Sequence, residues 1–174
     1  MRSLSFLSLS TFPSIRFHVV GLTWRSSTTQ AAHDKAARKL FLGLERLEGV
    51  LSESDYLLGD RVTASDLMLF PTLVRFDAVY AVLFKCSKRR IRDYPCLTRW
   101  MQRMMELPGS LDSFDLQEAI ASYYEQLFPL NPSGITPYGP SSWEDLGVDP
   151  TRKIERNDQE FRKRFHFSSA SSIV

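Results

Sequence analysis

Cysteine is scarce in this chain of 174 residues, which contains only Cys86 and Cys96. A small secreted domain held by disulfides needs several cysteine pairs, so a disulfide framework is not expected and reduced thiols are. Long apolar runs are also missing, since no stretch approaches the roughly 18 apolar residues that a membrane-spanning helix requires. With 43% hydrophobic residues, the sequence instead predicts a soluble chain with one globular core and no membrane partner.

Motifs for metal or nucleotide binding are lacking as well. His18, His33 and His166 have no partners at metal-ligand spacing. The sequence also contains no Cys-x-x-Cys, no His-Glu-x-x-His and no Gly-rich phosphate loop. We therefore expect neither a metal centre nor a nucleotide site.

The formal net charge is only +2, and both ends of the chain are basic. Between residues 85 and 92, five basic side chains follow one another closely. A nucleic-acid-binding patch would need interleaved aromatic residues or a second basic face, and neither is evident. Cations are favoured just after a helix by the negative end of its dipole, so we predict a solvated helix end and no nucleic-acid partner. The basic residues are Lys85, Lys88, Arg89, Arg90 and Arg92.

The first thirty residues have a distinct composition. They contain seven serines, four threonines and Arg2, Arg16 and Arg25, and the first acidic residue is Asp34. This composition is typical of an organelle transit peptide, which would direct the protein to a plastid or a mitochondrion. The alternative, which we favour, is a variant or mis-assembled start of a cytoplasmic protein. In either case, we predict that residues 1–30 are disordered.

Helical periodicity is strong from residue 31 onward. Apolar side chains recur at three- and four-residue steps over 31–52, and charged residues such as Glu45 and Glu48 occupy the opposite side. This pattern predicts one helix over 31–52 that is half-buried in a bundle. Its predicted inner face consists of Ala37, Leu40, Phe41, Leu44, Leu47 and Leu51.

Residues 59–70 carry the most informative local signal. Thr63 and Asp66 are spaced as a capping box, in which the hydroxyl accepts from the N–H of Asp66 and the carboxylate accepts from the N–H of Thr63. The apolar residues that follow predict a buried helix over about 64–85. Pro71 lies inside it and predicts a bend, because proline removes one hydrogen bond and crowds the carbonyl four residues back.

Two further helices are expected. Pro95 begins the third helix, and the Pro-Gly pair at 108–109 ends it. A fourth helix is predicted over about 112–127, with Tyr123 and Tyr124 on its inner side.

Several motifs, in order along the chain, resemble one family. They are Gly-Asp-x-x-Thr-x-x-Asp at 59–66, Leu-Val-Arg-Phe-Asp-Ala-Val-Tyr at 73–80, Asp-Tyr-Pro at 93–95 and Asn-Pro-Ser-Gly-Ile at 131–135. Together they are similar to the helical C-terminal domain of the Xi-class glutathione transferases, the glutathionyl-hydroquinone reductases. The resemblance implies an all-α fold, a helical bundle of the glutathione transferase C-terminal type, over residues 31–146. Residues 147–174 would then form a basic, partly disordered tail.

In that family, an N-terminal thioredoxin-like domain binds glutathione and carries the nucleophilic cysteine in a Cys-Pro-Trp motif, which this sequence does not contain. Leu22 stands where the family has a tyrosine that helps to hold the hydroquinone. Cys86 lies beside cations that would lower its pKa, but it lacks the context of a transferase nucleophile and is interpreted as structural. We therefore assign no catalytic residue and expect the isolated chain to be inactive.

Tyr123 is the candidate substrate-binding residue. Counted back from Asn131, it occupies the place of a family tyrosine that contacts the quinol, so the resemblance implies a phenol that donates to a hydroquinone oxygen. The alternative is that Tyr123 packs within the bundle with its hydroxyl bonded to a backbone carbonyl. The resemblance also implies a hydrophobic, quinol-type small molecule as partner, glutathione as co-substrate with its site mostly absent here, and a homodimer.

Two functional hypotheses follow. In the first, the chain is a truncated glutathione transferase C-terminal domain from a family that reduces S-glutathionyl-hydroquinones, and it supplies the hydrophobic substrate side of the site and dimer contacts. In the second, it is a non-catalytic interaction module whose exposed apolar face a partner would cover.

Overall fold

The computed structural model describes residues 29–126 and 131–151, and within these ranges it contains helices and no strand. The predicted all-α fold is therefore confirmed. The predicted disorder of the first thirty residues lies almost wholly outside the described ranges, as does most of the predicted tail. The helices are α2 (Gln30–Glu53), α3 (Ala64–Val74), the π-helix η3 (Phe76–Tyr80), α4 (Ala81–Leu83), the 3-10 helix η4 (Ile91–Asp93), α5 (Pro95–Met105), α6 (Leu116–Ala121) and the π-helix η5 (Ser122–Gln126).

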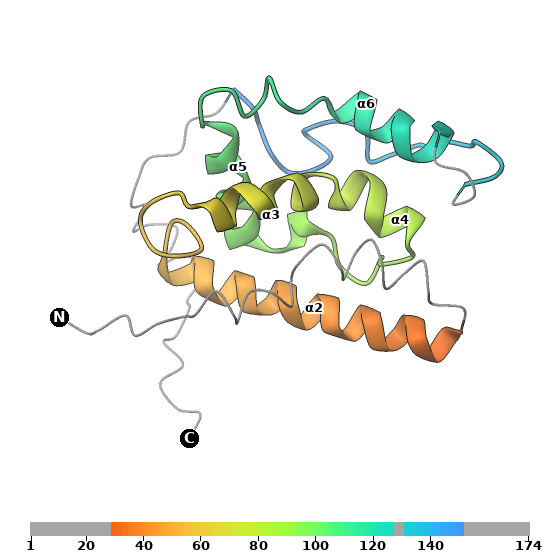
Figure 1. Ribbon diagram of the computed structural model, residues 1–174, viewed down its shortest axis with the longest axis horizontal. Coiled ribbons are helices and arrows are strands. Elements are labelled where there is room, and N and C mark those ends of the chain that lie inside the picture. The colour runs from red at the N-terminus through yellow and green to blue at the C-terminus, as the bar shows by residue number, and fades with distance from the viewer. Residues whose placement is uncertain (1–28, 127–130, 152–174) are drawn as a thin grey trace.

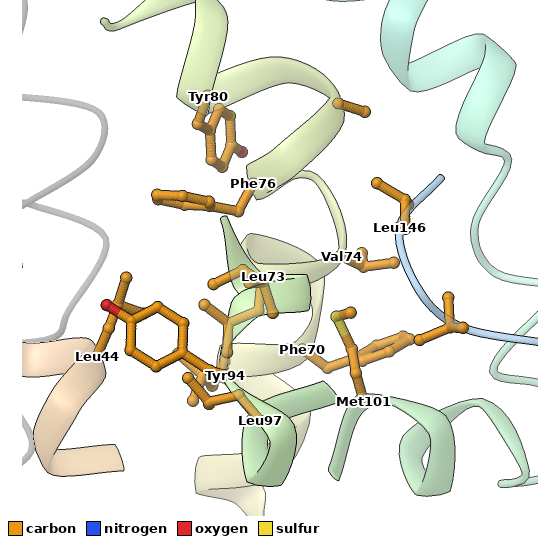
Figure 2. Packing of buried hydrophobic residues seen from close by; sticks show 14 of the residues in the cluster. Leu44, Phe70, Leu73, Val74, Phe76, Tyr80, Tyr94, Leu97, Met101 and Leu146 are labelled. Carbon is orange, nitrogen blue, oxygen red and sulfur yellow. The ribbon is translucent and has the colours of Figure 1, made fainter. Parts of the chain in front are cut away.

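The helices form three levels, with α2 along one side, α3, α4 and α5 in the middle, and α6 on the opposite side (Figure 1). The apolar stripe of α2 faces α5, as its periodicity predicts, although Ala36 is buried where Ala37 was expected and Ala37 is only partly buried. Figure 2 shows the core where these levels meet. It is built from Leu44, Phe70, Leu73, Val74, Phe76, Tyr80, Tyr94, Leu97, Met101 and Leu146.

The second predicted helix is present, but it changes type along its length. Pro71 lies within α3, whereas the regular α-helix ends at Val74 and the chain continues as the π-helix η3. The guanidinium of Arg75 donates to the Pro71 carbonyl at 2.7 Å. The interruption of the helix therefore lies after the proline, at the start of the segment that carries Tyr80.

The fourth helix begins later than predicted. Asp115 accepts hydrogen bonds from the N–H groups of Gln117 and Glu118 at 2.7 and 3.1 Å, so α6 starts at Leu116 and not near residue 112. Its second half is the π-helix η5. The prediction missed both features because it rested on apolar spacing alone, and residues 110–113 form turns.

Asp66 does more than the predicted capping box requires. The box is present, with the carboxylate accepting from the N–H of Thr63 at 2.9 Å. The same carboxylate accepts from the Thr63 hydroxyl at 2.8 Å, from the N–H of Leu57 at 2.9 Å and from the Trp100 indole at 2.9 Å. Asp66 is fully buried, so one side chain joins the preceding loop, the start of α3 and the middle of α5.

A second carboxylate reaches between helices. Glu48, on α2, accepts from the N–H groups of Cys96 and Leu97 at 2.9 Å each, and so caps the first turn of α5. The prediction that placed Glu48 on the outward side of its helix is therefore wrong, since it is half-buried between the two helices. Asp77 similarly accepts from Ile91 at 2.6 Å and holds the start of η4.

Candidate functional site

Tyr123 lies on the π-helix η5, half-buried, with its hydroxyl 3.1 Å from the hydroxyl of Tyr80 on η3. The two rings meet edge to face, with centroids 5.5 Å apart and an interplanar angle of 73°. Tyr80 in turn stacks on Phe84, at 5.5 Å and 30°. Tyr80, Phe84 and Tyr123 therefore form one aromatic cluster. Within it, Tyr80 and Tyr123 bring their hydroxyls together, and we call these two residues the tyrosine pair.

Both members of the tyrosine pair lie on π-helical turns, since η3 spans Phe76–Tyr80 and η5 spans Ser122–Gln126. A π-helix inserts one residue into the α-helical hydrogen-bond pattern and is frequent at functional sites. Here the two wide turns bring hydroxyls together that are 43 residues apart in the sequence. Tyr80 belongs to the 73–80 motif, but no local signal marked it as a partner of Tyr123.

Tyr124 takes the packing role that was the alternative for Tyr123. Its hydroxyl donates to the backbone carbonyls of Ala78 and Val79, at 3.3 and 3.2 Å, and its side chain is buried. Burial raises the pKa of Tyr124 to about 12. Tyr123 is more exposed and its hydroxyl meets a side chain. Neighbouring tyrosines on one turn thus have different surroundings.

The protonation of Tyr80 follows from its environment. Burial, and then the hydrogen bond with Tyr123, raises the pKa of Tyr80 above its usual value, so Tyr80 keeps its proton at neutral pH. A protonated Tyr80 can donate to the Tyr123 oxygen, and this leaves the Tyr123 proton available for a further acceptor. The pair can therefore present one hydroxyl donor beside an aromatic surface.

The loop that follows η5 is tied to the same site. The side-chain amide of Asn131 donates to the Tyr124 carbonyl at 2.8 Å and to the Ile135 carbonyl at 3.0 Å. Gly134, with a φ of 64°, closes the turn by donating to the Asn131 carbonyl at 3.0 Å. The Asn-Pro-Ser-Gly-Ile motif therefore fixes the end of the turn that carries Tyr123.

Cys86 is a structural residue in this arrangement. It is 1% exposed, and its thiol lies 3.7 Å from the Phe84 carbonyl. Burial raises the pKa of the Cys86 thiol to about 12, so the expectation that nearby cations lower it is wrong. Cys96 is also buried, at 2% exposure. Neither thiol is placed to act as a nucleophile.

The basic stretch at 85–92 contacts the surface of its own domain. Lys88 lies over the Phe41 ring at 5.5 Å, and Arg89 lies over the Tyr94 ring at 4.0 Å. The guanidinium of Arg92 donates to a backbone carbonyl in the C-terminal segment at 2.8 Å. At these three residues the stretch is therefore packed on its own domain and is not the fully solvated helix end that the sequence predicted.

Among residues 29–126 and 131–151, no three side chains of the metal-binding types lie close enough together to hold an ion. His33 lies 3.5 Å from the carboxylate of Asp34, and His18 and His166 fall outside the described residues. Over the same ranges, none of the helices has the length and apolar character needed to cross a bilayer.

Comparison with known proteins identifies relatives of this helical unit. Residues 30–103 match the family described as glutathione S-transferase, C-terminal domain. The glutathionyl-hydroquinone reductase PcpF of Sphingobium chlorophenolicum is 44% identical over 115 residues, which are 66% of this chain and 37% of that protein. The glutathione-bound structure of YqjG, a glutathione transferase homologue from Escherichia coli K-12, superimposes with a TM-score of 0.71 at 35% identity, over 79% of this chain and 44% of that one.

The crystal structure of the glutathione S-transferase Xi from Phanerochaete chrysosporium is similar too, with a TM-score of 0.66 and 39% identity over 71% of this chain and 42% of that one. The chain thus spans between 37% and 44% of the length of these three proteins.

Proposed function

Because residues 30–103 belong to the glutathione S-transferase C-terminal domain family, we propose that this chain provides the aromatic, substrate-facing part of a site that acts on S-glutathionyl-hydroquinones. The observation that carries the proposal is the tyrosine pair. Its rings offer an apolar surface for a quinol, and Tyr123 offers a hydroxyl donor for a quinol oxygen. The similarity to a glutathionyl-hydroquinone reductase supports the substrate class.

The reaction is a reduction of the S-glutathionyl-hydroquinone in two steps. A cysteine thiolate attacks the glutathionyl sulfur, the bond between sulfur and the aromatic carbon breaks, and that carbon takes up a proton, which releases the hydroquinone. A glutathione thiolate then attacks the resulting mixed disulfide, which frees the cysteine and yields glutathione disulfide. Both cysteines of this chain are buried, so its own contribution is to hold the quinol and not to supply the thiolate.

Two measurements test this division of roles. The purified chain should not accelerate the reduction of an S-glutathionyl-hydroquinone by glutathione, and turnover abolished by Cys86→Ser would overturn the assignment. The chain should nevertheless bind p-hydroquinone, measured by NMR titration. Tyr123→Phe should weaken that binding about 2- to 12-fold, since a hydrogen bond contributes about 0.5–1.5 kcal/mol. Tyr138→Phe, at a fully exposed position, is the matched control. Equal affinity of both variants for hydroquinone would show that the Tyr123 hydroxyl does not contact the quinol.

A second candidate function, a non-catalytic interaction module, is favoured by a different observation. Apolar side chains at the start of α3 and just before it are exposed, among them Leu67 at 58% and Met68 at 55%. Leu58 and Val62 extend this surface, at 43% and 39%. Exposed apolar surface of this kind commonly marks an interaction site.

A thioredoxin-like half from a relative, supplied in trans, distinguishes the two functions. In the first, the added half covers apolar surface, so binding of a hydrophobic dye falls and glutathione-dependent reduction of an S-glutathionyl-hydroquinone appears. In the second, the added half changes neither dye fluorescence nor activity. Leu67→Ser combined with Met68→Ser should lower the dye signal if this surface is the one that binds the dye.

A further inference from the structure

The two π-helical turns that carry the tyrosine pair are joined by Tyr124. Its hydroxyl, which extends from η5, donates to the carbonyls of Ala78 and Val79 in η3, at 3.3 and 3.2 Å. Ala78 and Val79 directly precede Tyr80 in the chain, and Tyr124 directly follows Tyr123. The contact therefore joins the same two turns as the hydroxyl contact of the tyrosine pair.

The contacts between these two turns differ in what they hold. Within the described part of the chain, the hydrogen bonds between η3 and η5 come from the hydroxyls of Tyr80, Tyr123 and Tyr124. The tyrosine pair joins two side-chain ends, which can rotate while the backbone stays in place. Tyr124 instead binds two successive backbone carbonyls, so it sets the distance between the turns themselves.

Burial makes the Tyr124 contact difficult to break. Tyr124 is 3% exposed, and its ring belongs to the hydrophobic core. If the turns moved apart, its hydroxyl would lose both acceptors in a place that water does not reach, and an unsatisfied buried donor is costly. Tyr123 is only partly buried, so its own hydroxyl contact can be exchanged for one with a ligand.

The backbone end of Tyr124 is held as well. Its carbonyl accepts from the side-chain amide of Asn131 at 2.8 Å. Tyr124 is therefore fixed at its hydroxyl by η3 and at its carbonyl by the loop that follows η5. Because Tyr123 is the preceding residue, its backbone has little freedom to shift relative to Tyr80.

We propose that Tyr124 is the positioning residue of the quinol site. By holding η3 and η5 at a fixed separation, its hydroxyl places the Tyr123 hydroxyl between Tyr80 and a quinol oxygen. The role rests on the proposed function, because it concerns the same site. Tyr124 does not itself contact the quinol, since its side chain is buried and its proton is shared by two backbone carbonyls. It acts on the substrate through Tyr123.

Tyr124→Phe in the full chain tests this role, because it removes the hydroxyl and keeps the ring in the core. NMR of tyrosines that are isotope-labelled at Cζ reports the hydrogen bonding of each phenol. The Cζ signals of Tyr80 and Tyr123 should shift in the free variant. Its affinity for p-hydroquinone should fall about 2- to 12-fold, and no further than in Tyr123→Phe.

Tyr94→Phe is the matched control. It also removes a buried hydroxyl, but one that makes no hydrogen bond within the described part of the chain. The control should change neither the Cζ signals of the tyrosine pair nor the affinity for p-hydroquinone.

A double-mutant cycle separates positioning from general support of the fold. If Tyr124 acts through Tyr123, then Tyr124→Phe should lower hydroquinone affinity less than about 1.5-fold in a chain that already carries Tyr123→Phe. Additive losses would show that Tyr124 supports the fold alone and would overturn the role. Unchanged Cζ signals of the tyrosine pair in the single variant would overturn it too.

The wild-type chain gives a second measurement, which does not depend on the folding of any variant. When p-hydroquinone is added, the Cζ signal of Tyr123 should move and that of Tyr124 should stay, because only Tyr123 exchanges its hydrogen bond. A comparable shift at Tyr124 would show that its hydroxyl is not fixed, against the inference. If the wild-type chain does not bind hydroquinone, the proposed function is wrong and this role with it. If Tyr123→Phe weakens binding and Tyr124→Phe does not, only the positioning role is wrong.

Discussion

Replacing Asp66 by alanine should destabilise this domain far more than the loss of an ordinary helix cap. A capping residue contributes about 1 kcal/mol, and this is the effect expected of Thr63→Ala. Asp66→Ala also leaves the buried Trp100 indole and the Leu57 N–H without their acceptor. Each unsatisfied buried donor costs about 1–3 kcal/mol, so the cap and the two donors together should cost about 3–7 kcal/mol.

Urea unfolding followed by circular dichroism measures these differences in the free energy of unfolding. Trp100→Phe removes one of the donors, so Asp66→Ala should cost about 1–2 kcal/mol less in that background than in the wild type. Asp66→Asn should fall between wild type and Asp66→Ala, since the amide keeps one acceptor but points a donor at N–H groups. If Asp66→Ala costs no more than Thr63→Ala, the carboxylate does not connect the loop, α3 and α5 as described.

Three further predictions concern other buried groups. Glu48→Ala should cost about 1–2 kcal/mol because it uncaps α5, whereas Glu45→Ala, on the exposed side of the same helix, should cost less than about 0.5 kcal/mol in the same unfolding assay. Burial raises the pKa of Asp77, so its protonated form favours the fold and its contribution to stability falls as pH rises above about 4; Asp77→Asn should therefore be more destabilising at pH 4 than at pH 7. Burial raises the pKa of the Cys86 thiol to about 12, so iodoacetamide should label it only as fast as the domain unfolds, and rapid labelling of the native chain would contradict its burial.

The features that the sequence predicted correctly are local. The helix over 31–52 and the helix that begins at Pro95 were recognisable because apolar periodicity and end signals lie within one segment. The capping box of Thr63 and Asp66 is local for the same reason. Each of these features depends on residues no more than a few turns apart.

The polar contacts between helices could not be predicted in this way. Glu48 has the spacing of a solvent-facing residue, and only the position of α5 makes it a cap. Asp55 likewise pairs with Arg99 at 3.1 Å and Arg103 at 2.5 Å, and all three side chains are buried. Sequence periodicity predicts that a charged residue is exposed, whether its side chain contacts water or a neighbouring helix.

The candidate site could be predicted only in part, because its main contact also joins residues that are distant in the sequence, with one exception. The motif pointed to Tyr123, but its partner Tyr80 lies 43 residues away, and the π-helical turns that align their hydroxyls have no sequence signature. The exception is the spacing between Tyr123 and Asn131, which is set by a contact: the Asn131 side-chain amide donates to the carbonyl of Tyr124 and fixes the end of the turn that carries Tyr123. A fixed spacing between two motifs can therefore reflect a hydrogen bond between them.

Asn131→Ala should loosen the site without changing either tyrosine ring. Expected results are broadened Tyr123 ring signals in NMR and weaker hydroquinone binding, with little change in the free energy of unfolding. Unchanged ring signals would mean that the loop and the tyrosine turn are held independently.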